Sequence, residues 1–262
     1  MTLQERVLTY TTMLFLLSAG TSFAAHPLIS DDAGTLGKGN MQVELNGEIG
    51  TDKETTGGST TKSTGRQVAS SFGIGVTDKI DVALGVTRPW GNGDVDGASF
   101  NDAGSADFSL AMKWQVYEHE RLSVAVKPQF GYSYAVGATD DHAVSYGAAL
   151  VISKEFEPFA VHLNIGYTYN DYNLADVRDA SRSSVMSYSL AGTCEVIKNL
   201  KLVADVGAAT NEDKTSSDTP VFGLGGMIYS PDKSLDLSAA LKIGLTKPET
   251  DLTGLLGVTR KF

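Results

Sequence analysis

The sequence predicts an all-β protein, a closed antiparallel transmembrane β-barrel of about twelve strands. Three observations favour this fold class. Apolar and polar residues alternate with a period of two along most of residues 40–262, short turns alternate with longer polar stretches, and the last strand ends the chain on Phe262. A bilayer offers no water to unpaired backbone groups, so a spanning strand needs partners on both edges, and only a closed barrel supplies them.

Residues 1–24 are typical of a secretory signal peptide. Residues 13–17 form a short apolar core, and the small residues Ser22 and Ala24 precede the expected cleavage, so the mature chain is expected to begin at Ala25. A membrane anchor is the alternative, but the apolar run falls well short of the ~20 residues that a spanning helix needs. We therefore expect membrane insertion to occur through strands.

The composition excludes several classes of partner and cofactor. The net charge of -10 leaves no basic field for nucleic acid. The single cysteine, Cys194, cannot form an internal disulfide and is too few for a cysteine-based zinc site or an iron–sulfur cluster. We expect no nucleic-acid partner, no cofactor and no metal site.

Residues 25–39 precede the first strand and are expected to lie on the periplasmic side. Residues 26–39 read His-Pro-Leu-Ile-Ser-Asp-Asp-Ala-Gly-Thr-Leu-Gly-Lys-Gly, and residues 40–48 continue as a strand with alternating Gln and Glu. This pattern resembles the outer-membrane proteins grouped as the MetA-pathway of phenol degradation family. The resemblance implies an outer-membrane barrel that transports small hydrophobic or aromatic compounds.

Residues 40–262 are expected to form the barrel. The expected strands cover residues 41–49, 64–77, 80–87, 107–116, 122–134, 144–152, 159–170, 186–190, 200–206, 222–228, 235–246 and 252–262. In each strand the apolar face should contact lipid and the small or polar face should line the lumen. On this reasoning Phe222, Leu224 and Ile228 belong to a lipid-facing side. Pro128 lacks a backbone donor and is expected to cause a bulge.

The connections indicate the orientation in the membrane. Short turns lie at residues 78–79, 118–121, 155–158, 198–199 and 231–234, and longer polar stretches at 51–63, 91–102, 137–141, 171–181 and 211–218. In bacterial outer-membrane barrels the short turns are periplasmic and the long loops extracellular. Residues 25–39 and the carboxyl terminus are therefore expected at the periplasmic end.

Charged and polar residues on the inward faces are the candidate site residues. The lumen-lining candidates are Glu44, Glu48, Asp81, Asp107, Lys113, Lys127, His162, Asp205 and Lys242. Such charges tune selectivity in an open pore, or pair with a plug in a closed one. Asp31 and Asp32 are the plug candidates, with Lys113, Lys127 and Lys242 as expected partners. A cation site at the two aspartates is a less favoured alternative.

These observations predict a passive channel or transporter for small, aromatic or hydrophobic molecules in the bacterial outer membrane. One alternative is a structural or partner-binding barrel with a closed lumen. Another is an outer-membrane hydrolase, which would need a serine, His162 and an orienting group to converge; we expect no enzyme. The expected partners are outer-membrane lipid, small-molecule solutes and the barrel-assembly machinery.

Phe262 resembles the terminal residue of the assembly signal in outer-membrane barrels, although Arg260 departs from that pattern. Deleting Phe262 should lower the amount of protein in the outer membrane without stopping its secretion to the periplasm. Cell fractionation and immunoblotting would measure both pools. Unchanged outer-membrane levels of the truncated protein would contradict a role in assembly.

Overall fold

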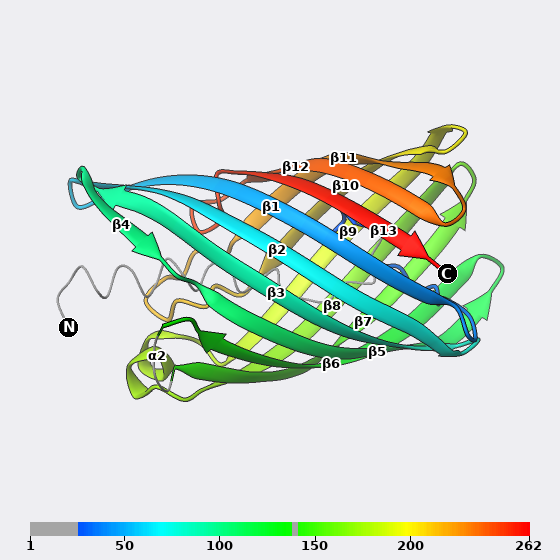
Figure 1. Cartoon of the computed structure of the whole chain (residues 1–262), viewed down its shortest axis with the longest axis horizontal. Helices are drawn as coiled ribbons and strands as arrows, with labels where there is room; N and C mark the ends of the chain where they lie inside the picture. The colour runs from blue at the N-terminus through cyan, green and yellow to red at the C-terminus, as the bar shows by residue number, and fades with distance from the viewer. Residues whose placement is uncertain (1–25, 138–140) are drawn as a thin grey trace.

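The computed structural model describes residues 26–137 and 141–262, and the expected signal peptide lies outside them. The strands are β1 (Met41–Thr56), β2 (Ser59–Thr77), β3 (Ile80–Val95), β4 (Ala98–Asp102), β5 (Ser105–His119), β6 (Leu122–Ala135), β7 (His142–Phe156), β8 (Phe159–Tyr172), β9 (Ser184–Ile197), β10 (Leu200–Ala209), β11 (Val221–Asp232), β12 (Leu235–Gly244) and β13 (Leu252–Lys261). A short helix, α2 (Ala175–Ala180), lies at the long-loop end (Figure 1). Among the described residues, no helix has the length and apolar character to cross a bilayer.

Twelve of these strands form one closed antiparallel barrel, as the sequence predicts. Each strand pairs with the next, β5 pairs with β3, and β1 pairs with β13 from Gln42–Lys261 to Thr51–Leu252. The backbone N–H of Phe262 donates to the carbonyl of Met41 at 2.8 Å, so the last residue completes the closing ladder. β4 pairs only with the outer end of β3. Closure removes every edge at membrane depth, which satisfies the backbone within the bilayer.

Two of the polar stretches that the sequence analysis assigned to loops are strands, so the boundaries at 51–63 and 91–102 were wrong. β1 and β2 continue to a tight turn at Gly57 and Gly58, whose φ angles of 62° and 88° suit glycine. β3 and β4 form a second hairpin beyond the barrel (Figure 1). Strands in water need no apolar face, and the threonines of residues 51–61 favour extended backbone.

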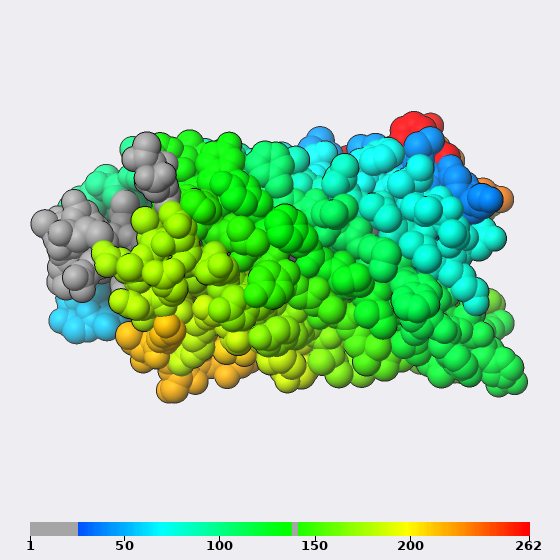
Figure 2. Space-filling model, turned by 90° about the horizontal axis from the view of Figure 1, so that it is seen from below, coloured from blue at the N-terminus to red at the C-terminus, as the bar shows by residue number. Residues whose placement is uncertain are grey.

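The outer wall is apolar and the inner wall largely polar. On β13, Leu256 is 67% exposed while Thr253, three positions away on the opposite face, is 2% exposed. Exposed and less exposed residues also alternate along β1, β5 and β12. In Figure 2, side chains cover the visible wall continuously. A side chain that is exposed in the isolated protein on this surface contacts lipid in the membrane.

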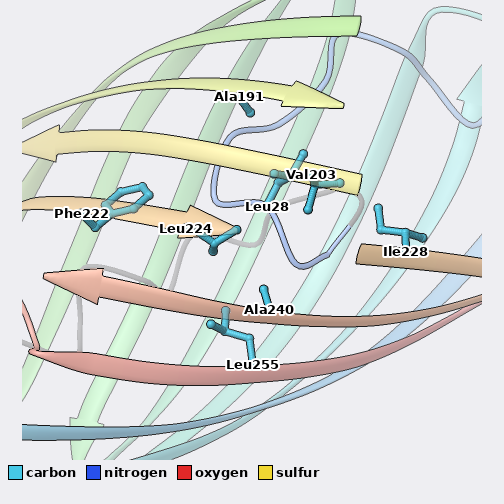
Figure 3. Packing of buried hydrophobic residues seen from close by; sticks show 8 residues of the cluster. All are labelled: Leu28, Ala191, Val203, Phe222, Leu224, Ile228, Ala240 and Leu255. Atoms are coloured by element: carbon cyan, nitrogen blue, oxygen red, sulfur yellow. The ribbon is translucent and has the colours of Figure 1, made fainter. Parts of the chain in front are cut away.

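The expectation for β11 was wrong, because Phe222, Leu224 and Ile228 face inward. They form a buried cluster with Leu28, Ala191, Val203, Ala240 and Leu255 (Figure 3). Ile29 packs against this cluster. The outward residues of β11 include Met227 and Tyr229. The prediction from the alternation assumed a uniformly polar lumen. Leu28 and Ile29, which precede β1, bring apolar side chains into the lumen, and these side chains need apolar neighbours.

The bulge expected at Pro128 is also absent from the β5–β6 ladder. Pairing runs to Ala111–Gln129 and resumes at Trp114–Val126 without a change of register. The register shift falls instead between Gln115 and Tyr117. The β5–β6 ladder therefore lacks pairs beside Pro128. The pairs on either side of this interval keep β5 and β6 in the same register.

The inward and outward faces of β9 should respond differently to charge. Leu190 lies near the middle of β9 on the outer face, and Leu190→Arg should cost about 2–4 kcal/mol of folding free energy because the guanidinium enters lipid. Ser187 lies on the inner face and borders a cavity, so Ser187→Arg is the control and should cost under about 1 kcal/mol. Unfolding in lipid vesicles would measure both, and equal losses would contradict the assigned faces.

Candidate functional site

The N-terminal segment, defined here as residues 26–39, lies inside the barrel and crosses its lumen. Its first residue reaches β12, where His26 Nδ1 and Ser238 Oγ are 2.7 Å apart. Its far end reaches the β2–β3 turn, where the backbone N–H of Lys38 donates to Asp78. Figure 3 shows Leu28 on this segment among residues of β9–β13. The segment thus contacts opposite sides of the wall before β1 begins.

Asp31 is the centre of the segment's attachment. Lys113 Nζ of β5 donates to Asp31 Oδ1 at 2.8 Å, and Lys127 Nζ of β6 donates to Oδ2 at 2.9 Å. All three side chains are almost fully buried. The backbone of Asp31 also exchanges two hydrogen bonds with the side-chain amide of Asn164, at 2.9 and 2.8 Å. Buried charges are costly without partners, so Asp31 stabilises both lysines and the two lysines stabilise Asp31.

A second carboxylate, Asp205 of β10, holds the neighbouring residues. Its Oδ2 accepts the backbone N–H groups of Ile29 and Ser30 at 2.9 and 2.7 Å, and its Oδ1 accepts the Ser30 hydroxyl at 2.8 Å. Three donors to one carboxylate fix the direction of the segment's backbone. The wall thereby satisfies backbone groups that have no strand partner.

His162 lies against the segment as well. Its Nδ1 is 2.8 Å from Ser153 Oγ, and that hydroxyl accepts the backbone N–H of Ala33 at 2.9 Å. Neither Ser153 nor His162 borders either of the two lumen cavities described below. The pair of side chains therefore serves as an attachment point for the segment.

The remaining sequence candidates are dispersed along the lumen. Asp81 accepts the backbone N–H of Leu36 at 2.9 Å. Glu44 accepts from Gln42 at 2.6 Å, Asp107 accepts from Ser133, and Glu48 borders the larger cavity. Lys242 pairs with Glu249 at 2.8 Å instead of the segment. The carboxylate of Asp32 accepts the backbone N–H of Gly34 at 2.7 Å, and its backbone carbonyl accepts from Lys113.

Two cavities flank the N-terminal segment. The larger, of about 390 Å³, reaches the long-loop end at Glu212 and Glu249, and the smaller, of about 150 Å³, reaches the short-turn end at Asp236 and Lys261. His26 and Glu44 border both cavities. The segment therefore divides the lumen, and these two side chains lie at the division.

Several contributors to the site gave no readable signal in the sequence. Glycines make room for the segment: a Cβ on Gly75 would lie 1.9 Å from the carbonyl oxygen of Gly37, and one on Gly257 would lie 2.3 Å from His26 Nδ1. Asn164 and Glu212 are placed at the lumen by contacts between residues far apart in the chain, Asn164 with Asp31 and Glu212 with Arg182. A glycine in a strand is compatible with a close approach of backbone, but the sequence pattern does not identify which segment approaches.

A closed barrel with an apolar belt and a partly charged lumen defines the class: the protein is a β-barrel of the bacterial outer membrane. The particular family follows from sequence. A family model described as "Putative MetA-pathway of phenol degradation" matches residues 24–262, and the chain belongs to this family. No curated protein matches the sequence.

Solved structures share the fold at low sequence identity. The COG4313 outer membrane channel from Pseudomonas putida F1 is similar with a TM-score of 0.65 and 14% identity, covering 88% of this chain and 98% of the other. The translocator domain of autotransporter NalP from Neisseria meningitidis gives 0.59 and 12%, covering 99% and 98%. The KdgM porin gives 0.56 and 8%, covering 84% and 99%. At such identities the likeness concerns the fold.

The two aspartates should differ in importance for attachment of the segment. Asp31→Asn removes one charge between two buried lysines and should weaken attachment by about 3–5 kcal/mol. Asp32→Asn is the control, because an amide oxygen can still accept the N–H of Gly34. Hydrogen exchange of the backbone amides of residues 29–36 would measure attachment. Similar protection in both variants would contradict the role of Asp31.

Proposed function

We propose that the protein is a passive channel that admits small molecules across the outer membrane. The observation that carries this proposal is the pair of cavities, one open toward each end of the barrel and both bordered by His26 and Glu44. A solute that crosses the lumen would pass between the N-terminal segment and β1 at this point. The fold likeness to a channel and a porin supports the proposal.

The N-terminal segment acts in this proposal as a plug that narrows the route. Its attachments come from β3, β5, β6, β7, β8 and β10 as well as β12, so it occupies the cross-section of the lumen. Small solutes would pass beside it, and larger ones would be excluded. The polar anchors and the buried ion pairs favour a fixed constriction.

The character of the larger cavity supports small solutes with both apolar and polar parts. Leu28, Phe222 and Leu255 border it, together with carboxylates such as Glu48. Aromatic or hydrophobic compounds, which the family description suggests, would contact the apolar group of side chains. A cavity of this composition resembles ligand sites in which a few polar groups orient an otherwise apolar molecule.

A barrel with a closed lumen is the principal alternative. The contacts between the N-terminal segment and the wall are the same in both hypotheses. The barrel with a closed lumen differs in conductance, because the gap at His26 and Glu44 would then admit no solute. The hydrolase alternative has less support. Ser153 and His162 are within hydrogen-bond reach of one another, but Ser153 bonds the segment's backbone and borders neither cavity.

Removing residues 26–37 while keeping residues 1–25 should raise single-channel conductance in planar bilayers. The physical reason is that the deletion joins the two cavities and removes Asp31 from between the lysines. Circular dichroism and heat-modifiable migration in gels would establish that the deleted protein still forms a barrel. Equal conductance in correctly inserted wild-type and deleted proteins would contradict the plug, and no conductance in either would contradict the channel.

A further inference from the structure

Glu212 is a buried acid that the channel's attachments do not use. It lies in the loop between β10 and β11, its side chain borders the larger cavity, and the residue is 9% exposed. Its Oε2 is buried without a hydrogen-bond partner in the described part of the chain. A buried carboxylate oxygen without a hydrogen-bond partner costs free energy, unless a water molecule or a ligand donates a hydrogen bond to it.

The loop that carries Glu212 is held firmly in place. The backbone N–H of Arg182 donates to the carbonyl of Glu212 at 2.7 Å. The Arg182 guanidinium donates to the carbonyls of Asn211 at 2.7 Å and Ser216 at 3.0 Å, and also to that of Asp213. One arginine thus fixes the backbone on both sides of Glu212. Its carboxylate is therefore positioned in advance at the cavity.

Aromatic and aliphatic side chains border the same cavity as Glu212. Tyr172, Val185 and Phe222 are each less than a tenth exposed and border the same cavity, as does Pro220. Burial raises the pKa of Glu212 to about 7, so at pH 8 the group is mostly ionised. Within the described residues it forms no ion pair. Aromatic and aliphatic side chains around one carboxylate suit a molecule with an apolar body and one polar end.

The charge of the cavity favours a positive polar end. Six carboxylates and two ammonium groups border it, and both ammonium groups are in ion pairs, Lys127 with Asp31 and Lys242 with Glu249. Glu44, Glu48, Asp107 and Glu212 remain outside ion pairs within the described residues. Low-dielectric walls around an excess of one charge concentrate the opposite charge.

A metal ion fits these observations less well than an organic cation. Within residues 26–137 and 141–262, no group of three or more His, Cys, Asp or Glu is placed to hold a metal. A single carboxylate can instead accept charge-assisted hydrogen bonds from one ammonium group.

We propose that Glu212, with Tyr172 and Phe222, forms a binding site at the extracellular end of the lumen for small protonated amines with an apolar body. The site deepens the proposed channel function, because it lies on the route that a solute would follow. The ammonium group binds the Glu212 carboxylate, and the apolar body packs against the two rings.

Three probes with the same ring test the charge requirement: benzylamine, benzyl alcohol and benzoate. Calorimetric titration of the full detergent-solubilised barrel at pH 8 should show that benzylamine binds at least about tenfold more tightly than the other two. Binding measured in this way does not require conduction. Absence of conductance would contradict the channel, whereas absence of benzylamine binding would overturn the site alone.

Two isosteric variants locate the site. Glu212→Gln should weaken benzylamine binding by about tenfold or more, because it removes the charge but keeps the shape. Asp218→Asn in the same loop removes an exposed charge and should leave the affinity within about twofold. Equal affinity in wild type and Glu212→Gln would overturn the proposal. Equally tight binding of benzyl alcohol would also overturn it, by assigning Glu212 to neutral hydrogen-bond donors.

Discussion

The ion pairs of Asp31 with Lys113 and Lys127 are the interaction on which the interior depends. Lysines that face into a barrel and are buried need acidic partners, and Asp31 accepts hydrogen bonds from both Lys113 and Lys127. This acid belongs to the N-terminal segment, so the two ion pairs hold the segment inside the barrel. The same contact brings the apolar residues Leu28 and Ile29 against β10, β11 and β13.

This interaction also compensates for a weak point in the wall. The β5–β6 ladder lacks pairs between Ala111–Gln129 and Trp114–Val126, next to Pro128. Lys113 belongs to β5 and Lys127 to β6, and Asp31 joins them inside the barrel at that interval. The segment that we propose as a plug thus also bridges two strands. In the proposed channel, the structural contacts of the N-terminal segment and its effect on the route would therefore be physically linked.

The lumen has two chemically distinct parts around the segment. Backbone and carboxylate anchors dominate where the segment meets β5–β8 and β10, and they leave few groups without partners. Toward the long loops, apolar side chains and carboxylates outside ion pairs border the larger cavity. The first part resembles a fixed interior, whereas the second has the mixed character of a solute-binding surface.

The sequence by itself determined the barrel. A period of two, repeated between turns, specifies which face of each strand meets lipid, because the bilayer imposes one apolar requirement on every strand. That local rule predicted twelve strands, the short-turn spacing and the closing position of Phe262. It failed at the β1–β2 and β3–β4 hairpins beyond the membrane, where water can satisfy the backbone of either a strand or a loop.

Only the tertiary structure decided what fills the lumen. The sequence indicated Asp31 and the lysines as candidates, but the choice of Lys113 and Lys127 over Lys242 depends on where the strands bring them. Phe222 and Leu224 follow an alternation that does not distinguish lipid from an apolar plug, and Glu212 acquires its character from burial by distant residues. Lumen contacts join residues far apart in the chain, so no local pattern encodes them.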